Sequence, residues 1–397
     1  MRHGQCLLFL SIISYASGYV VQFEVPVKFA DSNLTVRLLS LDLTTVESFV
    51  FDYRSFNKSR LNAFDPSASK KFKNKGEFKG LYSPPYNKEF VSTSGILGKD
   101  KIEYHGHVFK GEFGVVDRDN NNYIHKGIDG KERAGRLGFS RGDETWADLR
   151  EKFLKGNENK SLCLVVREYR SAVEATVSIG DPIYKPDEIV SYFNASFNNN
   201  GHWRVPLTSI QIGDYEIEVD TPGILSTSTD EIGFPKRIFN SVIAELRAVY
   251  YSSLKAYIVS CANRQPLRIG VNSTEITIDP SSYMKRVGLQ CALRLSPVDQ
   301  SIFILGGPFY NRRGVCMDFE DYTITLFRPV QRIYDGSQQA KEMVDDAALC
   351  LSHVPLFVKI VECPGSAARP QAEVFRCLHL ILTLINYHSG GSPSKSR

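Results

Sequence analysis

The chain has 397 residues, with 48 lysine and arginine residues against 44 aspartate and glutamate residues, a net charge of +4 and a pI near 8.5. This mild balance, together with the lack of any nucleic-acid-binding motif, argues against a nucleic-acid partner. The stretch from Tyr19 to Val330 has the composition of continuous globular sequence, long enough for two lobes with separate cores.

The first 18 residues have the pattern of a secretory signal peptide. Arg2 precedes an apolar run over residues 6–13, and small residues offer cleavage near Ala16 or Gly18. The run is too short to span a bilayer. Glycosylation sequons follow at Asn33, Asn57, Asn159, Asn194 and Asn272. We therefore expect a secreted protein, or one in the lumen of an endosomal-lysosomal compartment, without a membrane span.

Strand patterns dominate the rest of the chain. Residues 21–29 alternate apolar and polar, with Pro26 predicting an edge or bulge. Further short strands are predicted at 101–109, 162–166, 175–179, 203–212, 215–219, 276–278, 302–305 and 322–327. Two helices are predicted: one around Trp146, Leu149 and Phe153 with Asp143 as a cap, the other over 235–251. The pattern predicts a mainly β protein in two halves, residues 19–185 and 186–330.

Two further segments have open interpretations. Residues 331–397 differ in character and form a small appended helical element, a disordered segment, or an untranslated or mis-spliced stretch of the gene. A run of lysines is either a solvated loop or a contact for an anionic surface. It consists of Lys70, Lys71, Lys73, Lys75 and Lys79.

Seven cysteines remain after signal removal, and this odd count leaves one thiol free or paired between chains. None falls in a Cys-x-x-Cys arrangement, which argues against structural zinc. His105 and His107 alternate as metal ligands do, but a surface hairpin explains them better. We expect no metal and no cofactor.

Two aspartates stand in similar contexts half a chain apart. Asp42 ends the apolar run 38–41, and Asp220 follows the alternating run 215–219. Two carboxylates on matched loops suggest a like-charged pair in which one group holds a proton for the other.

From Tyr19 to Val330 the chain resembles the pepsin-like aspartic endopeptidases. Asp42-Leu43-Thr44-Thr45 and Asp220-Thr221-Pro222 stand where that family has its two Asp-Thr-Gly loops. Further motifs in family order are Phe64–Ser69, Gly95–Asp100, His202–Val205, Ile304–Gly306 and Val315–Phe319. The resemblance implies an all-β, bilobal fold with a few short helices and a catalytic pair, Asp42 and Asp220.

The same resemblance implies supporting roles for Thr44, Thr45 and Thr221, and a disulfide between Cys261 and Cys291. Cys163 and Cys316 fall on strands that the family places in its central sheet. They form either a disulfide with each other or two buried free thiols. The pairing of Cys350, Cys363 and Cys377 is left open.

Departures from the family pattern bear on activity. Where the family has a threonine in its first loop, this chain has Leu43, which lacks a hydroxyl. Pro222 lacks an N–H, and Gly223 stands where the family has a hydroxyl residue. The tyrosine of the flap, the hairpin that covers the family's cleft, is replaced by Lys88. We expect a catalytically weak or inactive, monomeric homologue that binds a peptide or protein in the inter-lobe cleft. The alternatives are an active endopeptidase working at acid pH through Asp42 and Asp220, and a scaffolding glycoprotein with a filled cleft.

Overall fold

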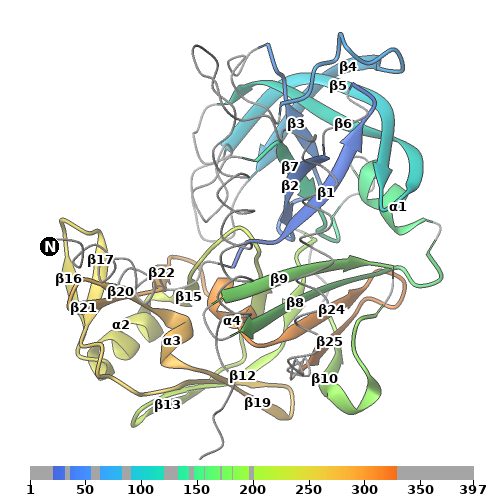
Figure 1. The fold of residues 1–397 in the computed structure, drawn as a ribbon. Helices are drawn as coiled ribbons and strands as arrows, with labels where there is room; N and C mark the ends of the chain where they lie inside the picture. The colour runs from blue at the N-terminus through green and yellow to red at the C-terminus, as the bar shows by residue number, and fades with distance from the viewer. Residues whose placement is uncertain are drawn as a thin grey trace, which may run out of the picture. The chain divides into compact units, whose positions relative to one another are not determined.

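The computed structural model describes residues 21–31, 36–54, 63–82, 91–119, 133–142, 147–155, 157–169, 172–180, 182–195 and 201–328 (Figure 1). The chain divides into two compact units, Met1–Val330 and Gln331–Arg397. The second unit lies outside the described residues, as do the candidate signal peptide, Asn33, Asn57 and Lys88.

The first half of the chain forms a seven-stranded sheet in the order β1-β2-β7-β3-β6-β5-β4. Alternation on β1 buries Val25, Val27 and Phe29 and exposes Pro26, which lies where β1 pairs only with β2. The strands are β1 (Glu24–Phe29), β2 (Val36–Asp42), β3 (Phe49–Phe51), β4 (Lys73–Tyr82), β5 (Val91–Tyr104), β6 (His107–Asp119) and β7 (Gly135–Gly138). Helix α1 (Asp148–Leu154) covers β6 where Gly111 leaves room for Leu149.

A five-stranded sheet combines strands from both halves in the order β10-β25-β24-β8-β9. Its members are β8 (Ser161–Tyr169), β9 (Ala172–Ile179), β10 (Ile189–Asn194), β24 (Gly314–Asp318) and β25 (Thr323–Phe327), with a 3-10 turn η4 (Pro186–Glu188) before β10. Cys163 on β8 lies directly opposite Cys316 on β24, and the two form a disulfide. The bridge, rather than two buried thiols, is therefore formed.

The second half contributes three further sheets. The first has the order β11-β14-β23-β15-β22, the second β13-β12-β18-β19 and the third β16-β17-β21-β20. Their strands are β11 (Arg204–Val205), β12 (Leu207–Ile212), β13 (Tyr215–Glu218), β14 (Gly223–Leu225), β15 (Ile232–Pro235), β16 (Val249–Tyr251), β17 (Ala256–Val259), β18 (Leu267–Val271), β19 (Thr274–Ile278), β20 (Met284–Val287), β21 (Gln290–Leu293), β22 (Leu295–Val298) and β23 (Phe303–Leu305). The Cys261–Cys291 disulfide joins the end of β17 to β21.

The helices are few and short: α1, α2 (Lys236–Glu245), α3 (Pro280–Tyr283) and α4 (Gly307–Tyr310) in the described ranges. None of these is long and apolar enough to cross a membrane. The predicted all-β, bilobal fold with a few short helices is confirmed, and the Cys261–Cys291 pairing with it.

Three predicted elements differ in extent. The helix predicted over 235–251 ends at Glu245, because Arg247 adopts a left-handed φ of 52° and Val249–Tyr251 pairs with β17 as a strand. The run 101–109 is a hairpin that turns at His105 and Gly106. Pro206, which has no N–H for a ladder, separates β11 from β12 within 203–212.

Candidate functional site

The first candidate loop follows the buried strand β2. Leu41 pairs with Leu137 and Asp42 with Gly138 in the parallel ladder between β2 and β7. A Cβ at Gly138 would lie 2.5 Å from the backbone carbon of Val46, so only glycine lets the chain after Asp42 pass this closely. The ladder and this close passage fix Asp42 at the end of the strand.

The second half repeats this arrangement of strands. β14 runs parallel to β23 as β2 runs parallel to β7, and β15 lies antiparallel to β23 as β3 does to β7. β22 lies parallel to β15 as β6 does to β3. The two halves therefore present equivalent loops after β2 and β14.

The register of the repeat identifies the residue equivalent to Asp42. Leu225 pairs with Leu305, as Leu41 pairs with Leu137, and the N–H of Ser226 donates to the Leu305 carbonyl at 3.1 Å. Ser226 is fully buried. The position equivalent to Asp42 is thus held by a serine, followed by Thr227, Ser228 and Thr229.

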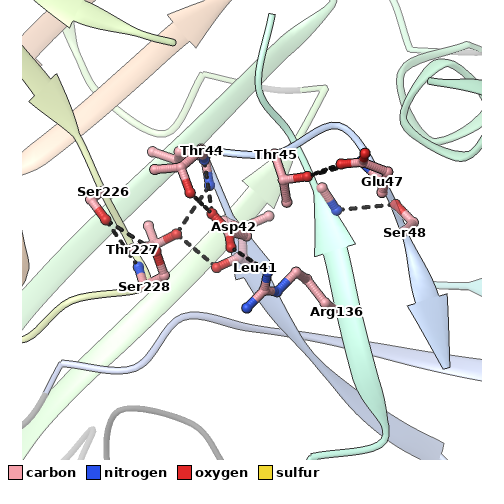
Figure 2. Close-up of polar contacts among 12 residues, drawn as sticks. Leu41, Asp42, Thr44, Thr45, Glu47, Ser48, Arg136, Ser226, Thr227 and Ser228 are labelled. Atoms are coloured by element: carbon pink, nitrogen blue, oxygen red, sulfur yellow. Dashed lines mark hydrogen bonds and ion pairs between the residues drawn. The ribbon is translucent and has the colours of Figure 1, made fainter. Parts of the chain in front are cut away.

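A hydroxyl of the second loop is hydrogen-bonded to the first loop (Figure 2). Thr227 Oγ1 donates to the carbonyl of Leu41 at 2.7 Å and accepts from the N–H of Leu43 at 3.3 Å. Leu43 holds the position in the first loop that is equivalent to Thr227. Its side chain is apolar and buried, so it has no hydroxyl that could bond to the second loop. Leu43 therefore makes no side-chain hydrogen bond equivalent to that of Thr227.

Asp220 does not share this position. It is exposed and precedes β14, whereas the loop that meets Asp42 follows β14. Asp42 ends β2 and is only 1% exposed, so the two carboxylates lie in different environments. By strand position Asp220 is therefore not the residue equivalent to Asp42, and Thr221, half-buried beside it, also precedes β14.

The Asp42 carboxylate is held by its own loop. The N–H and the hydroxyl of Thr44 both donate to Asp42 Oδ1, at 2.8 and 2.6 Å. The hydroxyl of Thr45 donates to Glu47 instead. The supporting hydroxyl expected from Thr45 is thus supplied by Thr44.

A cation lies against the other carboxylate oxygen. Arg136 Nη1 lies 3.3 Å from Asp42 Oδ2, and both side chains are largely buried (Figure 2). Arg136 comes from β7, pairs in register with Phe49 on β3 and stacks over the ring of Phe49 with its guanidinium carbon 5.8 Å from the centroid. A buried carboxylate beside a buried guanidinium forms a charge-balanced pair.

His202 adds a titratable group near this loop. Burial, together with the positive charge of Arg204, lowers the pKa of His202 from 6.5 to about 4, although Asp42 and a hydrogen bond with the Thr44 backbone act in the opposite direction. The imidazole is therefore neutral at physiological pH. Burial also raises the pKa of the Tyr310 phenol, and the charge on Asp42 raises it further.

Four residues of this site were absent from the sequence-based prediction: Arg136, His202 as a site residue, Ser226 and Thr227. A signal for Ser226 and Thr227 exists, because the apolar run Gly223-Ile224-Leu225 is followed by four hydroxyl residues, as Leu39-Ser40-Leu41 is followed by Asp42 and then Thr44-Thr45. Arg136 has no such signal, since only the β2–β7 pairing brings it to Asp42.

The chemistry open to this arrangement differs from that of an aspartate pair. Two carboxylates sharing one proton can bind and activate a water, and pepsin is the usual illustration. A serine hydroxyl does not ionise near neutral or acid pH and cannot share that charge. Here Asp42 accepts from Thr44 and pairs with Arg136, and the Ser226 hydroxyl shares a hydrogen bond with that of Ser228.

Comparisons with known proteins agree with this architecture. The family model for eukaryotic aspartyl protease matches residues 188–328. Plasmepsin IV, from two isolates of Plasmodium falciparum, is 24% identical over 135 residues. These alignments cover 32% of this chain and 30% of the length of plasmepsin IV.

The matched segment includes Ser226 and its loop, while the repeated strand pairing extends the same architecture to the half that carries Asp42. Residues 188–328 are thus similar to the eukaryotic aspartyl proteases, and the chain spans about 30% of the length of the plasmepsin IV sequences that it matches.

Proposed function

We propose that this protein is a non-hydrolysing member of its family that binds peptide or protein segments between its two lobes. The observation that carries the proposal is the composition of the two loops: Ser226 holds the position equivalent to Asp42, and Arg136 balances the charge of Asp42. Family members that cleave peptides need a second carboxylate there.

The energetics support the loss of hydrolysis. A carboxylate dyad keeps one proton because two like charges cannot both ionise at close range. Asp42 has a cation as its neighbour, so this coupling is replaced by a salt bridge. Preorganised catalytic groups tolerate displacements of only about 0.5 Å, and here one of the two groups has a different chemistry.

We further propose that the protein is secreted or lumenal and glycosylated. Disulfides at Cys163–Cys316 and Cys261–Cys291 are typical of oxidising compartments. The sequon residues Asn159, Asn194 and Asn272, which lie in the described ranges, are all exposed. A mobility shift of the protein from a eukaryotic secretion host after treatment with a peptide:N-glycosidase tests this assignment, and the absence of a shift contradicts it.

Hydrolysis is tested with purified protein and an acid-denatured protein substrate between about pH 3 and about pH 7, with products identified by mass spectrometry. We expect no cleavage by the wild type. The matched control is Asp42→Asn, which keeps the shape of the side chain. Cleavage by the wild type that disappears in Asp42→Asn would establish the alternative, an active acid endopeptidase.

Binding is tested separately by passing a mixture of casein-derived peptides over the immobilised protein and sequencing the retained peptides. We expect retention of a defined subset of peptides. Retention no greater than on a blank column contradicts the binding proposal, and favours a scaffolding glycoprotein with a filled cleft.

A further inference from the structure

The lysine run noted in the sequence becomes part of a larger charged surface in the fold. Lys73 on β4 pairs in register with Lys99 on β5, and Lys101 on β5 pairs with Lys110 on β6. Directly paired residues and residues two apart share a face of a sheet. These four lysines therefore lie on one face, and it is the solvent face because Ile102, between Lys101 and Glu103, is buried.

Exposed lysines next to β4 extend this surface. We define the lysine surface as the exposed residues Lys70, Lys71, Lys73, Lys75, Lys101 and Lys110. The strands that carry it, β4 to β6, lie side by side in Figure 1.

Acidic residues close to the surface are already engaged. Glu112 pairs with Lys99 at 2.9 Å, Glu103 with Lys28 at 3.0 Å and Glu77 with Lys79 at 3.0 Å. Within the described ranges, the six residues of the lysine surface form no ion pair, so its positive charge is uncompensated by the protein itself.

Protection of a sheet edge explains only part of this arrangement. Lysines on an edge strand hinder edge-to-edge aggregation, which accounts for Lys73 and Lys75 on β4. β5 lies inside the sheet, between β4 and β6, and carries Lys101 opposite Lys110. Like charges directly opposite each other destabilise an antiparallel pair, so this placement costs stability without an anionic ligand.

We propose that the lysine surface binds a sulfated polysaccharide. Lysine ammonium groups act as compact point charges and suit densely spaced sulfate groups. The two disulfides fit an oxidising, extracellular setting where such polymers occur.

The composition of the surface disfavours other polyanions. Single-stranded nucleic acids are bound by exposed aromatic rings that stack on bases. Phe72, Tyr104 and Phe109, which lie within three positions of these lysines in sequence, are half-buried. Lipid surfaces are bound by apolar side chains that insert beside the basic ones. Val108 is the one exposed large hydrophobic residue on the described part of β4 to β6.

The test uses fluorescently labelled heparin and the full chain at about 50 mM salt, where surface charges are weakly screened. The first variant combines three substitutions on the lysine surface: Lys73→Gln, Lys101→Gln and Lys110→Gln. The control variant removes the same charge from exposed positions elsewhere by combining Lys155→Gln, Lys185→Gln and Lys236→Gln. At roughly a fivefold loss of affinity for each lysine removed, we expect the first variant to bind heparin about 150-fold more weakly. The control variant should stay within about twofold of wild type.

Several outcomes overturn the proposal. These are no binding of heparin by the wild type, equal weakening in both variants, binding of unsulfated hyaluronan as tight as heparin, or tighter binding of phosphatidylserine vesicles or a single-stranded oligonucleotide. Circular dichroism and melting curves confirm that each variant is folded. Peptide retention at the paired loops should be the same in all three proteins, which separates this proposal from the proposed function.

Discussion

Thr227 and Leu41 join the two halves of the protein: the threonine hydroxyl donates to the leucine carbonyl at 2.7 Å, across 186 positions of sequence. The same oxygen accepts the N–H of Leu43. One side chain therefore satisfies two backbone groups of the opposite loop, and both loops depend on it for their relative position.

The variant Thr227→Val tests this link. Valine keeps the shape but leaves the Leu41 carbonyl without this buried donor, so we expect the free energy of unfolding to fall by about 1–3 kcal/mol. Urea denaturation measures it. Thr227→Ser keeps the hydroxyl and should lose less. If valine and serine variants are equally stable, the hydroxyl bridge contributes nothing.

The ion pair between Arg136 and Asp42 predicts strong coupling between the two residues. Arg136→Leu leaves the Asp42 carboxylate buried without its cation, and we expect a loss of about 3–5 kcal/mol in unfolding free energy at neutral pH. Adding Asp42→Asn to this variant removes the unpaired charge and should recover most of the lost unfolding free energy. Additive effects of the two substitutions in a double-mutant cycle would contradict the pairing.

His202 predicts a loss of stability in mild acid. Its pKa is about 4 in the folded protein and 6.5 as the ordinary value, so the unfolded chain takes up the proton first as the pH falls. Stability from neutral His202 is fully present above about pH 6.5 and is lost as the pH falls toward 4, by about 3 kcal/mol in total.

The measurement is the melting temperature of wild type and His202→Gln between about pH 4 and about pH 7. Glutamine does not titrate, so the difference between the two proteins should shrink or reverse on acidification. A difference that is constant over this range would show that His202 does not titrate with a lowered pKa.

The two disulfides close loops of different length and should differ in their effect. Cys163 and Cys316 are 153 residues apart, and Cys261 and Cys291 are 30 apart. Chain entropy predicts stabilisation of about 5 kcal/mol for the first and about 3.6 kcal/mol for the second. Replacing each pair by two alanines and measuring unfolding in urea tests this order. A larger loss from the Cys261–Cys291 pair contradicts it.

The fold was largely predictable because its signals are local. Alternation in residues 21–29 predicted β1, and Leu149 with Phe153 predicted the buried face of α1. Strand ends and turns were less predictable: the break at His105 and Gly106 depends on backbone angles that alternation does not reveal. Val249–Tyr251 shows the same limit, since its pairing with β17 outweighs a helical stripe.

The candidate site, like the fold, was only partly predictable from the sequence. The all-β class, the likeness to aspartic proteases and the place of Asp42 at the end of a buried strand could be predicted from the sequence, because periodicity, ordered motifs and an aspartate after an apolar run are local features. The equivalence of Ser226, rather than Asp220, to Asp42 and the pairing of Arg136 with Asp42 emerged from the fold. Strand register sets both, and register depends on backbone pairing between residues far apart in the chain.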